Sequence, residues 1–116
     1  MANPVTHFEV IGQDAAALQR FYGEVFGWEM QDVMDGSYYM AHPGSGPDGG
    51  VGRAMDGGQG HVTFYVEVDD LAPALARIQE LGGRTIQDPM DVPGGPTIAL
   101  FADPEGHVIG LVGRQS

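Results

Sequence analysis

Apolar and polar residues alternate near the start of the chain. In residues 5–11, Phe8 and Val10 fall on one side of an extended backbone, while His7 and Glu9 fall on the other. An alternation with a period of two is typical of a half-buried strand. The pattern therefore predicts a strand that has one apolar and one polar face.

A helical pattern follows this strand. Asp14 is a residue type that caps the beginning of helices, and Gly27 is one that ends them in a left-handed conformation. Between them, apolar residues recur at steps of three and four, which places them on one face of a helix. The members of this stripe are Leu18, Phe21, Tyr22, Val25 and Phe26.

Three short strands are predicted after this helix. They cover residues 28–31, 37–41 and 51–55, and they are separated by the Asp35-Gly36 turn and by the glycine-rich residues 42–50. The order is thus one strand, one helix and three strands, a βαβββ unit.

The second half of the chain repeats this order. Residues 63–83 align without gaps with residues 7–27, as expected of an internal repeat. Alternation gives an apolar strand face formed by Val62, Phe64, Val66 and Val68. Asp69 or Asp70 would cap the following helix, and Gly82-Gly83 would end it.

Three more strands complete the second unit, at residues 84–87, 97–102 and 107–112. The glycine-rich stretch around residues 57–60 would join the two halves. We therefore expect one α+β domain over residues 1–116, made of βαβββ modules at residues 1–57 and 58–116.

Charge and composition narrow the functional classes. Sixteen acidic residues against five basic ones give a net charge of −11, so most faces would repel a nucleic acid backbone. The chain has no cysteine, which excludes disulfides and thiolate ligands and fits a reducing compartment. No apolar run is long enough to span a membrane. These features predict a cytoplasmic protein without nucleic acid or membrane partners.

Three motifs in order resemble the vicinal oxygen chelate superfamily, which includes glyoxalases, bleomycin resistance proteins and extradiol dioxygenases. They are Phe-Tyr-Gly-Glu-Val-Phe-Gly-Trp at residues 21–28, Val-Glu-Val-Asp-Asp-Leu at 66–71, and Phe-Ala-Asp-Pro-Glu-Gly-His-Val-Ile at 101–109. The resemblance implies two βαβββ modules whose mixed sheets curve around a ligand-binding cleft, and a homodimer.

The strand faces opposite the helices carry a polar mixture that is unusual for a core. Together with aromatic side chains that offer stacking surfaces, they form the predicted ligand-binding set. This set is His7, Glu9, Trp28, Tyr39, Thr63, Tyr65, Glu67, Phe101 and Gly110. Packing between sheet and helix is the alternative for Trp28 and Phe101, and of Tyr38 and Tyr39 only one can face the cleft.

The resemblance also implies a divalent metal held by histidines and carboxylates, but most of those positions differ here. His7 keeps the first, whereas Thr63 stands at the second histidine position and Gly110 follows Ile109 where a carboxylate is expected. We therefore expect no metal and no other cofactor. A displaced set of His7, Glu9 and His61 is the alternative.

These observations predict a protein that binds a small organic molecule without the metal site of the family. His7 and Glu9 can act as proton acceptors if their surroundings favour it, so metal-independent catalysis stays open and no catalytic residue is assigned. Two alternatives remain. One is a metal-dependent glyoxalase-like lyase, isomerase or dioxygenase, and the other is a bleomycin-resistance-like protein that sequesters an antibiotic.

Overall fold

The computed structural model describes residues 2–55 and 57–114. Internal contacts divide the chain into two compact units. The first module is Thr6–Thr63, and the second module comprises the residues up to Val5 together with those from Phe64 onward. This division falls between residues 5 and 6 and between residues 63 and 64, and the module boundary after residue 57 stays a prediction.

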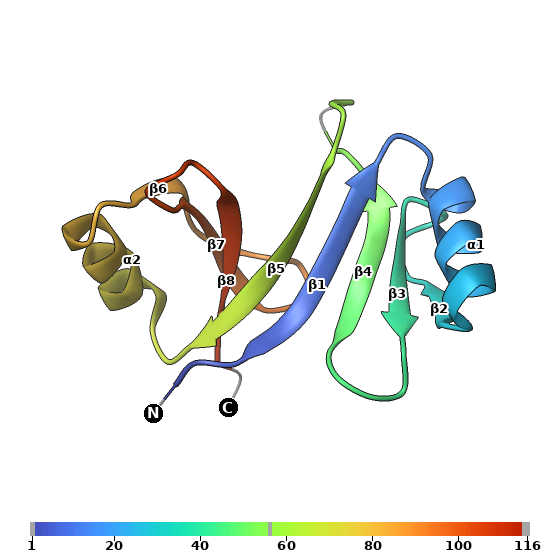
Figure 1. The fold of residues 1–116 in the computed structure, drawn as a ribbon, viewed down its shortest axis with the longest axis horizontal. Helices are drawn as coiled ribbons and strands as arrows, with labels where there is room; N and C mark the ends of the chain where they lie inside the picture. Colours follow the sequence, from blue (N-terminus) through green and yellow to red (C-terminus); the bar gives the residue numbers. More distant parts are fainter. Residues whose placement is uncertain (1, 56, 115–116) are drawn as a thin grey trace. The chain divides into compact units, whose positions relative to one another are not determined.

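The first module contains the predicted βαβββ order (Figure 1). Its elements are β1 (Val5–Gly12), α1 (Ala15–Phe26), β2 (Glu29–Asp32), β3 (Tyr38–His42) and β4 (Asp48–Arg53). The strand order is β2-β3-β4-β1, with β1 parallel to β4 and the other pairs antiparallel. The helix α1 contacts β4, β3 and β2 of this sheet.

The strand β4 begins earlier than the predicted residues 51–55, because part of the glycine-rich stretch is extended. Gly49 and Gly50 pair with Phe8 and Glu9 of β1. A Cβ atom on Gly49 would overlap the ring of Phe8, so a residue without a side chain is needed there. These glycines belong to the sheet and not to a loop.

Both ends of α1 follow the predicted capping residues. The Asp14 side chain accepts a hydrogen bond from the Ala17 N–H at 3.0 Å. Gly27 is left-handed, with φ of 71°, and its N–H donates to the Gly23 carbonyl oxygen at 2.8 Å. The cap and the stop are therefore confirmed.

Aromatic rings pack α1 against its sheet. The Trp28 ring centroid lies 5.2 Å from that of Phe8 on β1 and 5.9 Å from that of Tyr22 on α1. Phe26 also contacts Trp28 at 5.2 Å. Rings at these separations stabilise the contact beyond the area that they bury.

The second module has the same element order. It contains β5 (His61–Val68), α2 (Leu71–Glu80), β6 (Arg84–Asp91), β7 (Thr97–Ala102) and β8 (Val108–Gly113). The strand order is β5-β8-β7-β6, with β5 parallel to β8 and the other pairs antiparallel. Aliphatic side chains fill its core, namely Val68, Leu71, Leu75, Ala99 and Leu111.

The burial of β5 is the reverse of the predicted apolar face at its beginning. Val62 is 75% exposed, whereas Thr63 and Tyr65 are each 8% exposed. One cause is visible in the second module, where the Tyr65 ring occupies the space over Gly110, its pairing partner on β8. A glycine opposite an aromatic residue makes room for a ring that alternation alone would place on a polar face.

The predicted fold class is confirmed as α+β with two βαβββ modules and mixed sheets. Within residues 2–55 and 57–114, no helix combines the length and the apolar character that crossing a bilayer requires.

Candidate functional site

Polar side chains gather on one face of the sheet in the first module. In the parallel pairing of β1 with β4, His7 lies opposite Asp48 and Glu9 lies opposite Gly50. Residues at alternate positions of a strand share a face, so His7 and Glu9 point to the same side. Phe8 points to the other side, where it meets Trp28.

Tyr38 of β3 joins His7 and Glu9. Its hydroxyl donates a hydrogen bond to Glu9 Oε2 at 2.9 Å and lies 3.1 Å from His7 Nε2. A phenol has only one hydrogen to donate. Because that hydrogen goes to the carboxylate, the hydroxyl oxygen accepts from His7, which places a proton on Nε2.

Two glycines of β4 make the position of Tyr38 possible. A Cβ atom on Gly50 would overlap the hydroxyl end of Tyr38, and one on Gly52 would lie 2.6 Å from Tyr38 Cδ2. The tyrosine side chain therefore lies across the bare backbone of β4. This brings a hydroxyl from β3 over to side chains on β1.

His61 completes a hydrogen-bonded set on this face. Its Nε2 lies 3.3 Å from Glu9 Oε1, whereas the Tyr38 hydroxyl donates to Glu9 Oε2. The Glu9 side chain is 14% exposed and that of His61 is 54% exposed. We call His7, Glu9, Tyr38 and His61 the polar set. It holds one carboxylate between a hydroxyl and an imidazole.

The surroundings of His7 favour its neutral form. Burial lowers the pKa of His7 below its ordinary value, although the carboxylates of Glu9 and Asp48 act in the opposite direction. Asp48 is itself engaged, since its Oδ2 lies 3.0 Å from His42 Nδ1. A neutral imidazole that donates from Nε2 orients the Tyr38 hydroxyl without repelling a ligand cation.

Hydrogen bonds link the residues of the polar set to one another, and the absence of a metal stays a prediction. No group of three or more histidine, aspartate or glutamate side chains among residues 2–55 and 57–114 is placed to hold a metal ion. The displaced set of His7, Glu9 and His61 is linked by hydrogen bonds instead, with the Tyr38 hydroxyl between His7 and Glu9. Oxygen and nitrogen atoms that face one another in this way can hold and relay a proton.

Three further predicted site residues belong to the first module, namely Trp28, Tyr39 and Thr63. Trp28 packs with the aromatic rings under α1, as its alternative interpretation had it. Tyr39 pairs with Val51 and so lies on the face opposite Tyr38. Thr63 is buried. Of the two neighbouring tyrosines, Tyr38 therefore lies beside His7 and Glu9, and a role of Tyr39 in ligand binding stays a prediction.

The predicted residues of the second module have packing and ion-pair partners there. The Tyr65 ring covers Gly110, and Phe101 packs against the aliphatic core. Glu67 Oε1 lies 3.9 Å from Arg114 Nε, an ion pair that is partly exposed. Their role in ligand binding stays a prediction.

Sequence reasoning missed Tyr38 because alternation assigns two neighbouring tyrosines to opposite faces without saying which face is which. The glycines at positions 50 and 52 carry the missing signal. Two glycines at alternate positions of a strand leave a bare strip on one face, and a large side chain from a neighbouring strand can cover it.

Comparison with known proteins gives a family and a fold. A family model described as "Glyoxalase-like domain" matches residues 8–112. A "Glyoxylase-like domain-containing protein" from Didymella fabae is 25% identical over 119 residues, which cover 95% of this chain and 93% of that protein. The anthracycline biosynthesis protein DnrV from Streptomyces peucetius is 31% identical over 124 residues. That match covers 85% of this chain but 42% of DnrV.

A crystal structure of a methylmalonyl-CoA epimerase superposes with a TM-score of 0.70 at 19% identity. The superposition covers 97% of this chain and 95% of the epimerase. At this level of identity the likeness concerns the fold, and the chemistry has to be argued from the residues of this chain.

Proposed function

Since the chain belongs to the glyoxalase-like domain family, as the match over residues 8–112 shows, we propose that it binds a small organic molecule at the polar set and moves a proton on it. The observation that carries this proposal is the pair of bonds made by the Tyr38 hydroxyl, to Glu9 and to His7. They hold a carboxylate and a hydroxyl together on one sheet face.

Glu9 is the proton acceptor in this proposal. Its carboxylate is mostly enclosed, and each of its two oxygens has a fixed partner, Tyr38 or His61. Fixed partners hold a base in one orientation, which favours proton transfer to it from a C–H or O–H group. The substrate class that fits is a molecule with an acidic C–H beside a carbonyl group.

Tyr38 has a complementary role. When Glu9 takes a proton from carbon, its carboxylate becomes neutral and no longer needs the phenolic hydrogen. The Tyr38 hydroxyl can then turn that hydrogen toward the enolate oxygen, while the neutral Nε2–H of His7 still supports the hydroxyl from the other side. Return of the proton from Glu9 to the same face of the carbon regenerates the starting molecule. If the planar enolate first turns its other face toward Glu9, return of the proton completes an epimerisation with every atom conserved.

The relatives agree with this class of ligand without naming one for this chain. One relative acts in anthracycline biosynthesis, and a protein of the same fold is an epimerase of an acyl thioester. Epimerisation next to a carbonyl group requires the removal and return of a proton, as proposed for Glu9.

Two probes test the proposal. Methylmalonyl-CoA, incubated with the protein in D2O, is examined by NMR for exchange of its α-hydrogen, and daunorubicin is titrated by calorimetry. The variants are Glu9→Gln and Tyr38→Phe, and the matched control is Tyr39→Phe on the opposite face. If methylmalonyl-CoA exchanges its α-hydrogen, we expect Glu9→Gln to slow that exchange about 10²-fold. Tyr38→Phe should weaken exchange or binding about tenfold, and Tyr39→Phe should leave both unchanged.

The outcomes separate the alternatives. Exchange that Glu9→Gln leaves at the original rate would overturn the proposal. Tight daunorubicin binding without exchange of any probe would indicate a binding protein that sequesters its ligand. Exchange that EDTA abolishes and Mn²⁺ restores would favour a metal-dependent lyase or isomerase.

A further inference from the structure

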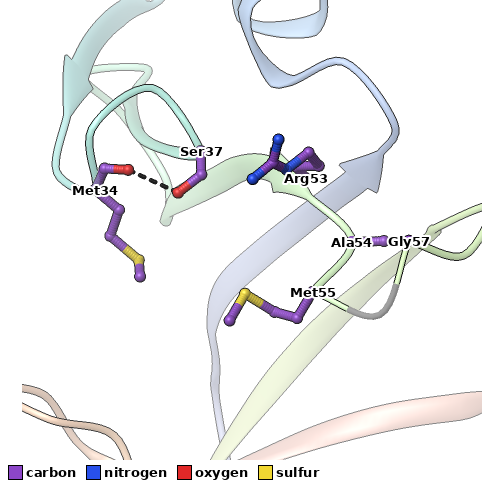
Figure 2. Close-up of a pocket in the computed structure, with 6 residues that line it drawn as sticks. All are labelled: Met34, Ser37, Arg53, Ala54, Met55 and Gly57. Atoms are coloured by element: carbon purple, nitrogen blue, oxygen red, sulfur yellow. Dashed lines mark hydrogen bonds between the residues drawn. The ribbon is translucent and has the colours of Figure 1, made fainter.

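A concave site, separate from the polar set, lies at one end of the sheet in the first module. Its volume is about 410 Å³, and it is formed by the turn between β2 and β3 and by the segment after β4 (Figure 2). The lining residues are Met34, Ser37, Arg53, Ala54, Met55 and Gly57. We call it the Arg53 pocket. The polar set contributes none of these residues, although Tyr38 directly follows Ser37.

Hydrogen bonds fix the wall that the β2–β3 turn provides. Asp32 Oδ1 accepts from the N–H groups of Met34 at 3.1 Å and Gly36 at 2.9 Å. The hydroxyl and the N–H of Ser37 both donate to the Met34 carbonyl oxygen, at 2.6 and 3.0 Å. This wall is therefore preorganised, and a ligand would not need to order it.

The wall after β4 is fixed in the same way. The N–H of Arg53 donates to the Ser37 carbonyl oxygen at 2.9 Å, and that of Ala54 donates to the Gly12 carbonyl oxygen at 2.8 Å. The N–H of Gly57 donates to the Ala54 carbonyl oxygen at 3.2 Å. With these donors engaged, the guanidinium of Arg53 is the strong donor that the pocket offers to a ligand.

The guanidinium of Arg53 carries a positive charge into the wall of this pocket. Arg77 and Arg114 pair with carboxylates of the second module. Arg53 forms no ion pair with any residue in the ranges 2–55 and 57–114, in a chain with sixteen acidic residues and five arginines. A guanidinium presents five N–H donors in a planar fork, which matches the oxygens of a carboxylate or a phosphate.

Two methionines give the pocket an apolar part. Met34 is 52% exposed and Met55 is 90% exposed. Their thioether chains extend into the open space beside Arg53 (Figure 2). Methionine side chains are flexible and adapt to ligands of different shape, so they can cover the alkyl or aryl part of a bound molecule.

We propose that the Arg53 pocket binds an organic oxyanion, a carboxylate or a phosphate attached to an apolar body. The guanidinium holds the oxyanion, and the thioethers of Met34 and Met55 cover the apolar body. This binding needs no proton transfer, so the proposal does not depend on the chemistry of the polar set. In a chain of charge −11, an anion is attracted most strongly near a guanidinium that no carboxylate among residues 2–55 and 57–114 neutralises by an ion pair.

NMR of protein labelled with ¹³C at the methionine methyl groups tests this directly. The probes are hexanoate, hexyl phosphate and hexanol, which share an alkyl chain and differ in the head group. We expect at least one of the two anions to shift the Met34 and Met55 methyl signals, assigned through Met34→Leu and Met55→Leu. The Met90 signal in the second module should stay in place. Hexanol should bind about tenfold more weakly.

Charge variants identify the anion-binding group. Arg53→Gln should weaken binding of the preferred anion about tenfold, and Arg53→Lys should weaken it less. Arg20→Gln, in the helix of the same module, is the matched control and should leave the affinity unchanged. Hexanoate binding more tightly than hexyl phosphate would identify a carboxylate ligand, and the reverse a phosphate. Equal affinity for hexanol and both anions, or an unchanged affinity in Arg53→Gln with the Met90 signal in place, would overturn the proposal.

Discussion

Both modules place a tyrosine above a strand glycine, but they take the tyrosine from different strands. In the first module, Tyr38 of β3 lies over Gly50 of β4. In the second, Tyr65 of β5 lies over Gly110 of β8. In each module the glycine lies on the strand that pairs with the first strand. The same backbone feature thus supports two different arrangements of the tyrosine.

The strand that contributes the tyrosine ring determines which other side chains this face of the sheet can hold. Glu9 and Tyr65 occupy corresponding positions of the repeat, and each pairs with the glycine of its own module. In the second module the ring itself fills that position. In the first, the ring arrives from β3, so the position stays available for a carboxylate that the tyrosine hydroxyl contacts. One module fills its face by packing, and the other keeps a hydrogen-bonded acid and base.

Substitution of Gly110 or Gly50 by alanine should give the largest difference in stability between the two modules. In Gly110→Ala, the new Cβ would lie 2.7 Å from Tyr65 Cγ, an atom that moves only if the buried side chain changes its χ1 angle. In Gly50→Ala, the atoms met belong to the hydroxyl end of Tyr38, which can rotate away. We expect Gly110→Ala to lower the free energy of unfolding by about 1–3 kcal/mol and Gly50→Ala to lower it by about 1 kcal/mol.

Urea denaturation measures the loss in free energy of unfolding for both variants, and each variant is the control for the other. Gly50→Ala should also disrupt the bonds of Tyr38 to His7 and Glu9, which changes the imidazole NMR signals of His7. Equal losses of stability, or unchanged His7 signals in Gly50→Ala, would contradict the distinction between a packed face and a polar one.

The beginnings of the two helices give a smaller contrast. The Asp14 side chain caps α1 by accepting from the Ala17 N–H, whereas the Asp70 side chain forms no cap bond to α2. Asp14→Ala should therefore lower the free energy of unfolding by about 1 kcal/mol, and Asp70→Ala by only a few tenths. Thermal or urea unfolding of the two variants checks this. A larger loss in Asp70→Ala would show that the second cap forms in solution.

Local signals in the sequence predicted the elements and their ends well. The N-cap at Asp14 and the stop at Gly27 depend on a few neighbouring residues, and both are confirmed. The repeated βαβββ order also follows from local periods. The predicted start of β4 was too late because glycines are weak strand formers. Partner rings explain these glycines, since the Phe8 ring lies over Gly49 and the Tyr38 ring lies over Gly50 and Gly52.

The polar set depends on partners that are distant in the sequence, and it was predicted only in part. Alternation placed His7 and Glu9 on one face, but the choice between Tyr38 and Tyr39 depends on how β3 lies against Gly50 and Gly52. The period of two is the same for either choice. Register between strands therefore decides the site, and one sequence alone does not give it.

The smallest expected contrast concerns pH. Burial lowers the pKa of His7 below its ordinary value, whereas Thr63 holds the corresponding position of the repeat and does not titrate. The unfolded chain therefore binds a proton at His7 at a higher pH than the folded protein does. The resulting stability is fully present above the unfolded pKa of about 6.5 and is lost as the pH falls through the folded pKa.

Urea midpoints measured from about pH 7.5 to 5.5 should decline less in His7→Gln than in the original protein. Identical slopes in His7→Gln and in the original protein would show that His7 is protonated equally in both states.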